Sequence, residues 1–161
     1  MMLDFGDIAL RLGAAAAAGI LLGINRDMQN KPIGARTLGL VALGTATIAV
    51  ASIQFPGMAE NSDAASRVVQ GIVQGVMAGI SFIGAGVILR DARTGMVEGL
   101  TTAATVWMTA ALGIACGLGA WRSVAIAAPL ALVLLAVVPW IENLFARTAE
   151  RPVEKSDRPP P

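Results

Sequence analysis

The side chains that most often carry out chemistry in proteins are scarce in this chain. It has no histidine, and its one cysteine, Cys116, lies inside an apolar run. These counts leave no Cys/His metal cluster, no intrachain disulfide and no Cys–His nucleophile pair. No buried acid and base pair, and no nucleophile beside a partner, is evident in the sequence. We therefore expect a protein that is not an enzyme and that holds no cofactor.

The carboxylates gather in short polar segments. Glu60 and Asp63, with Arg67 close by, could form an acidic mouth for a hard cation, because such cations take oxygen ligands. Two carboxylates on a loop are more often simply solvated, and we favour that interpretation for them and for Asp91 and Glu98. No acidic residue lies deep in the second, third or fourth apolar run. This weakens the case for a proton-coupled or magnesium-coordinating transport site.

Uncharged polar residues lie within or beside the apolar runs. They could line a polar pathway, or they could form hydrogen bonds between helices, each contributing about 0.6 kcal/mol. We favour interhelical hydrogen bonds for most of the set. The set is Gln70, Gln74, Ser81, Thr101, Thr102, Thr105 and Thr109.

The elements that must position these residues are strongly apolar. Of the 161 residues, 55% are hydrophobic and 14% are charged, and the mean hydropathy is +0.68. A soluble domain of this size needs more polar surface, so we predict an all-α integral membrane bundle of about five transmembrane helices. Residues 1–145 would form this membrane domain, and residues 146–161 a disordered, charged and proline-rich tail. The expected spans are 8–24, 38–53, 71–89, 101–118 and 123–144.

The third span looks like the centre of the bundle. Gly71, Gly75 and Gly79 recur every four positions, so they share a helix face on which a neighbouring backbone can come close. Gln70 and Gln74 lie on an adjoining face, where amides need partners out of contact with lipid. We therefore predict that this helix is surrounded by the others. A second ridge of Thr and Gly residues in the fourth span should also pack closely against a facing helix.

The basic residues predict the orientation. Nine Lys and Arg residues follow the first, third and fifth spans, whereas the opposite side has only Arg11, Arg67 and Arg122. The positive-inside rule then places the N-terminus in the periplasm and the C-terminus in the cytoplasm. The formal net charge of +1 gives no basic field for nucleic acid. The expected surroundings are the lipid bilayer, a membrane protein partner or a second copy of the chain.

Three ordered stretches resemble the MgtC/SapB family of bacterial inner-membrane proteins. Lys31–Thr37 (KPIGART) is similar to the family's KPAGLRT loop, Gly79–Gly86 (GISFIGAG) to GIGFLGAG, and Gly99–Gly113 to GLTTAATLWVTAAIG. Departures are Ser81, which replaces a motif glycine, and Asn25-Arg26-Asp27, where the family usually has Glu-Arg-Glu. The motif-matched or polar candidates for function are Arg11, Arg26, Asp27, Lys31, Gly34, Arg36, Thr37, Asp63, Arg67, Gln70, Gln74, Gly79, Gly84, Gly86, Thr101, Thr102 and Trp107.

The resemblance implies a regulatory, non-enzymatic protein of the inner membrane, active during adaptation to low magnesium or to life in a host. It also implies protein–protein contact with a membrane partner such as the ATP synthase. Magnesium is linked to the chain through this resemblance alone. The alternative is a small transporter or channel for Mg²⁺ or another cation.

The loop after the first span has two interpretations. Arg26, Asp27, Lys31 and Arg36 could dock a partner or an anionic ligand, or they could be positive-inside anchors that solvate helix ends. For Arg26 and Lys31 we favour anchors. Arg36 and Thr37 match the motif and adjoin the second span, so for them both interpretations stay open.

Overall fold

The computed structural model describes residues 3–54, 62–90 and 97–149. Within them are five long helices and one short antiparallel hairpin, in which Leu89 pairs with Glu98. The helices are α1 (Phe5–Met28), α2 (Ala35–Ile53), α3 (Ser62–Gly86), α4 (Leu100–Gly117) and α5 (Trp121–Ala149), and the hairpin strands are β1 (Leu89–Arg90) and β2 (Val97–Glu98). All five helices are long and apolar enough to cross a membrane. The predicted all-α membrane bundle is therefore confirmed.

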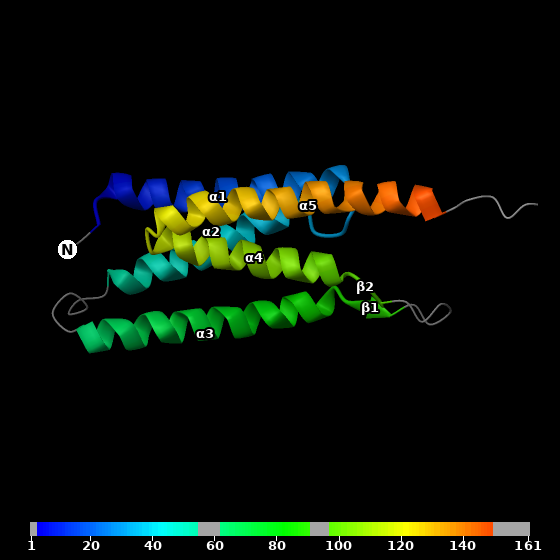
Figure 1. Cartoon of the computed structure of the whole chain (residues 1–161). Helices are drawn as coiled ribbons and strands as arrows, with labels where there is room; N and C mark the ends of the chain where they lie inside the picture. Colours follow the sequence, from blue (N-terminus) through cyan, green and yellow to red (C-terminus); the bar gives the residue numbers. More distant parts are fainter. Residues whose placement is uncertain (1–2, 55–61, 91–96, 150–161) are drawn as a thin grey trace, which may run out of the picture.

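The helices run alongside one another (Figure 1). The α1–α2 loop, the hairpin and the end of α5 lie at one end of the bundle, which we call the hairpin end. The start of α1 and the α4–α5 turn lie at the opposite end. This up-and-down arrangement places the two ends of the described chain at opposite ends of the bundle, as five crossings require.

All five helices begin before their predicted apolar spans. α3 begins at Ser62, nine residues before the predicted start at Gly71, and α5 continues to Ala149. Residues with good helix propensity can extend a helix past the edge of its apolar run, so hydropathy gives the membrane-crossing part and not the helix end. Glu60, Asp91 and residues 150–161, most of the predicted tail, lie outside the described residues.

The core is formed by α1, α2 and α4. Leu22, Leu38, Ala42, Val106 and Ala110 are almost completely buried. Glycine brings the three backbones together: a Cβ on Gly19 would collide with the Leu38 carbonyl, one on Gly113 with the Ala42 carbonyl, and one on Gly117 would lie 2.6 Å from the Ala46 carbonyl oxygen. Gly113 and Gly117 thus confirm that the predicted Thr/Gly ridge of α4 packs against α2. Thr105 and Thr109 of the ridge are buried, whereas Thr101 is exposed.

The predicted central position of α3 is wrong. Only 6% of its apolar stretch is buried, against 56% for α4, and a Cβ added to Gly71, Gly75 or Gly79 would meet nothing within 4 Å. α3 lies outside α2 and α4 and inserts Ile80 into the core cluster, as α5 does with Ala131 from another side. Both α3 and α4 carry small residues at a spacing of four, and that spacing shows only that a face can accept a close neighbour. The buried Thr, Ala and Gly residues of α4 show that this helix, and not α3, fills the centre.

Candidate functional site

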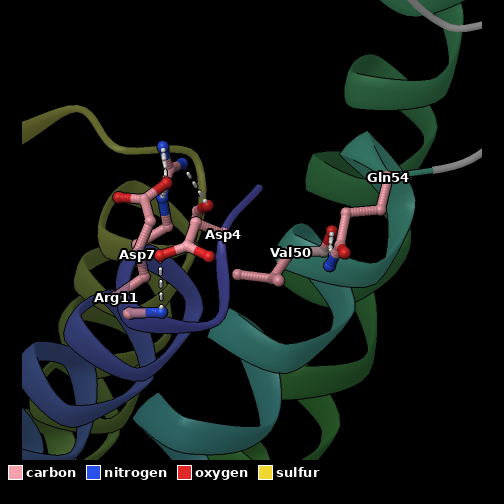
Figure 2. A network of polar contacts seen from close by, with 7 residues as sticks. Asp4, Asp7, Arg11, Val50 and Gln54 are labelled. Carbon is pink, nitrogen blue, oxygen red and sulfur yellow. Dashed lines mark hydrogen bonds and ion pairs between the residues drawn. The ribbon is translucent and has the colours of Figure 1, made fainter. Parts of the chain in front are cut away.

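Arg11 links α1 to the C-terminal end of α4 through a hydrogen bond. On α1 its side chain lies beside Asp7, and its Nε donates to Asp7 Oδ2 at 3.1 Å (Figure 2). Its Nη1 donates to the Gly117 carbonyl oxygen at 2.9 Å. That carbonyl is among the last four of α4, which have no partner inside their own helix. Arg11 therefore satisfies a helix end and also forms an i,i+4 ion pair with Asp7.

The same arginine lies beneath the α4–α5 turn. Gly119 in that turn has a φ of 75°, and a Cβ added to it would lie 2.7 Å from Arg11 Nη1. Glycine fits here for two reasons, the left-handed backbone and the space that the guanidinium takes. The sequence shows the turn but not the contact with Arg11.

At the hairpin end, Asp27 holds the loop that resembles the first family motif. Its Oδ2 accepts a hydrogen bond from the Ala35 backbone N–H at 2.9 Å and so caps the start of α2 from a neighbouring helix. This contact requires glycine at position 34, because a Cβ there would collide with the Asp27 carboxylate. A Cβ on Gly23 would likewise collide with the Ala35 backbone. Asp27, Gly23 and Gly34 are thus explained by the loop's geometry.

The other polar motif residues of this loop are exposed. Lys31 and Arg36 both point away from the core, and Thr37 is exposed at the rim of a groove between α2 and α3. Lys31 contributes its backbone N–H to the Arg26 carbonyl oxygen at 3.1 Å. Exposed basic groups at a helix end fit either an anchor or a docking surface, so both interpretations remain for Arg36.

Sequence reasoning missed Gln29. Its Nε2 donates to the Leu135 carbonyl oxygen of α5 at 3.1 Å and to Asn25 Oδ1 at 3.1 Å. Leu135 is four residues before Pro139, which has no N–H to offer it, so the helix leaves this carbonyl unpaired. A proline inside a predicted span is the signal that could have led to a search for a donor such as Gln29.

Arg26 differs from the other basic residues whose side chains the structure describes. Only 2% of its surface is exposed, and its Nη2 donates to Thr102 Oγ1 in the first turn of α4. The predicted role as a solvated anchor is therefore wrong for Arg26, because the end of α1 packs against α4 and carries the side chain inward. The structure thus joins two candidates, Arg26 and Thr102, that are far apart in the sequence.

The polar residues of α3 do not line a pathway. Gln70 and Gln74 are exposed on the outside of the bundle, and Ser81 donates to the Met77 carbonyl oxygen of its own helix at 2.7 Å. Thr105 and Thr109 likewise donate to the carbonyl oxygens of Thr101 and Thr105. For these hydroxyls the hydrogen bonds stay within one helix. Of the set for which we favoured interhelical bonds, Thr102 does bond between helices, because it accepts from Arg26 of α1.

Two grooves flank α3 within the described part of the chain. One, of about 420 Å³, lies between α2 and α3; Gly44, Ile48, Gly79 and Ile83 are among its lining residues. The other, of about 310 Å³, lies between α3 and α4 and includes Ser81 and the motif residues Gly84 and Trp107. The linings are mainly apolar and contain no acidic residue, so they suit hydrocarbon better than a hydrated cation.

The remaining candidates lie at the two ends of α3. Asp63 and Arg67 are exposed near its start, and Gly86 is its last residue, with nothing within 4 Å of an added Cβ. Groups of three or more His, Cys, Asp or Glu side chains that could hold a metal ion are not found among the residues described.

Comparison with known proteins places the chain in a family. Residues 12–144 match the MgtC family. The chain belongs to the MgtC family. Its sequence is 44% identical to protein SrpB of Synechococcus elongatus over 125 residues, which are 74% of this chain and 68% of that protein. It is 34% identical to protein SapB of Bacillus subtilis over 139 residues, 84% of this chain and 58% of SapB.

A further relative carries the family's name. Protein MgtC of Salmonella typhimurium is 40% identical over 114 residues, 71% of this chain and 45% of MgtC. This MgtC-family chain thus spans about half to two thirds of the curated relatives that it matches. No solved structure matches it.

Proposed function

We propose that this MgtC-family protein is a non-enzymatic regulator in the bacterial inner membrane, which acts by binding a membrane protein partner during adaptation to low magnesium. The observation that carries the proposal is the outer face of α3. Gln70 and Gln74 are exposed there, beside glycines whose Cβ positions are open. Gln74 is the thirteenth residue of this 25-residue helix and lies inside its predicted membrane span.

An exposed amide at that depth favours a protein neighbour. Lipid tails offer no hydrogen bond, so a side-chain amide gains from contact with another helix. The open glycines beside it let a second backbone approach, which is the usual geometry of tightly packed membrane helices. The resemblance to the family adds the ATP synthase as the first partner to test, with a second copy of this chain as the other.

The proposal is tested by growth at limiting Mg²⁺ and by crosslinking of α3 to a partner. A strain that lacks the protein should grow poorly at limiting Mg²⁺ and recover with the wild-type gene. Gly75→Leu should fold normally, because its Cβ meets nothing within 4 Å, yet fail to restore growth. Ala136→Leu, at an exposed position of α5, is the matched control and should restore growth.

Contact is measured with a photoreactive residue at position 74, and again with one at Val133 on the exposed face of α5. Crosslinking from position 74 to a membrane subunit of the ATP synthase, and not from position 133, is the expected result. The rival function predicts saturable Mg²⁺ uptake by purified protein in liposomes. Such uptake, or full rescue by folded Gly75→Leu, would contradict the proposal.

A further inference from the structure

Arg26 is a buried cation without a matching anion in the described chain. Its Nη2 has one neutral partner, Thr102 Oγ1, and its Nε, also buried, has no hydrogen-bond partner. Asp27, the adjacent acid, directs Oδ2 to the Ala35 N–H. No ion pair to Arg26 is found in residues 3–54, 62–90 and 97–149. A buried guanidinium is costly unless it is paired and fully hydrogen-bonded.

The first turn of α4 adds to the positive potential. Its N-cap is Gly99, with a φ of 89° and no side chain to accept from the first N–H groups, and its first turn contains no acidic residue. A helix N-terminus carries partial positive charge, so a cation beside it is unfavourable. Arg26 nevertheless lies there, because it is bonded to Thr102 in that turn. An anion that contacted both groups would be stabilised by both.

We propose that Arg26 and the first turn of α4 bind a phosphate group. Phosphate suits the site because its several oxygens can accept from a guanidinium and from helix N–H groups together. Leu100 and Thr101 are exposed, so the helix end is open to the outside while Arg26 lies behind it. The phosphate comes from a phospholipid headgroup or from free phosphate, since the site is at an end of the membrane-spanning helices.

The first measurement uses the whole wild-type chain in neutral detergent. Thermal unfolding is followed while inorganic phosphate replaces chloride at constant ionic strength, and in a second arm after addition of phosphatidylglycerol or of a galactolipid that carries no phosphate. A ligand that binds only the folded protein raises the unfolding temperature. Stabilisation by inorganic phosphate assigns free phosphate, and stabilisation by phosphatidylglycerol alone assigns a headgroup. Stabilisation by neither, or equally by the galactolipid, overturns the proposal.

Variants then locate the site. Arg26→Gln should weaken binding of the stabilising ligand about tenfold or more, since charge-assisted hydrogen bonds are lost. Lys31→Gln removes the same charge from an exposed position of the nearby loop and should change binding less than about twofold. Equal effects of the two variants would indicate attraction to surface charge and contradict the site.

Thr101→Asp covers the case in which Arg26→Gln does not fold. A carboxylate at this exposed first-turn position supplies the missing negative charge, so the variant should unfold at a higher temperature without ligand and gain nothing from phosphate. Thr101→Asn is the neutral control and should bind like the wild type. Wild-type binding by Thr101→Asp would rule the site out. This proposal does not involve α3, so its outcome is independent of the regulatory one.

Discussion

At the scale of single residues, three polar side chains act on the backbone of a neighbouring helix. Arg11 donates to the Gly117 carbonyl, Asp27 accepts from the Ala35 N–H, and Gln29 donates to the Leu135 carbonyl. Each backbone group lacks a partner in its own helix, at a terminus or before a proline. Lipid cannot supply that partner, so one side chain from another helix is well placed to do so.

The Gly119 turn gives a prediction at this scale. Gly119→Ala should lower the free energy of unfolding by about 1–3 kcal/mol, because a side chain is strained at its left-handed φ and its Cβ presses on Arg11. Thermal unfolding in detergent measures the change. Gly13→Ala is the control: nothing lies within 4 Å of its Cβ, and in a helix Ala is favoured over Gly by about 0.5–1 kcal/mol. Equal stability of the two variants would contradict the Arg11 contact.

At the scale of elements, the bundle has a tightly packed centre and two outer helices. α1, α2 and α4 approach through glycine and alanine, whereas α3 and α5 are largely exposed along their apolar stretches. Grooves lie on both sides of α3. α3 consequently has open space on both sides, which agrees with its proposed role in binding a partner.

Packing between α2 and α4 gives the second prediction. Gly113→Ala should cost about 1–3 kcal/mol of stability, since its Cβ would collide with the Ala42 carbonyl and with Thr45 Oγ1. Gly44→Ala, in α2 but facing the groove, should be neutral or stabilising because nothing lies within 4 Å. Unfolding temperatures in the same detergent compare the pair. Tolerance of Gly113→Ala would mean that the two helices are not in close contact.

At the scale of the whole molecule, the distribution of basic residues can be compared with the ends of the bundle at which the loops lie. The α1–α2 loop and the end of α5 lie at one end of the bundle, and the α4–α5 turn lies at the other (Figure 1). The charge pattern predicts that the first of these ends faces the cytoplasm. The structure fixes which loops share a side, and the membrane orientation stays a prediction.

Labelling of single cysteines in intact cells tests that orientation. With a membrane-impermeant thiol reagent, Arg122→Cys should react and Lys31→Cys should react only after the membrane is opened. Both native side chains are exposed and lie at opposite ends of the bundle, and native Cys116 is completely buried and should stay unlabelled. Reaction of Lys31→Cys alone in intact cells would invert the predicted topology.

The sequence by itself determined the membrane-spanning helices and the family. Apolar runs long enough to cross a bilayer specify helices locally, because each helix satisfies its own backbone hydrogen bonds. The Thr/Gly ridge of α4 was also predictable, since its spacing of four makes a continuous face.

Only the tertiary structure decided which helix is central and which polar residues meet. The glycines of α3 predicted a buried helix but face outward, because a spacing of four defines a face and not the neighbour that covers it. Arg26 was expected to be a solvated anchor, yet it is buried against Thr102, 76 positions away in the sequence. Contacts of this range depend on how the helix ends pack together. Local pattern carries no information about that packing, so the buried cation became visible only in the folded bundle.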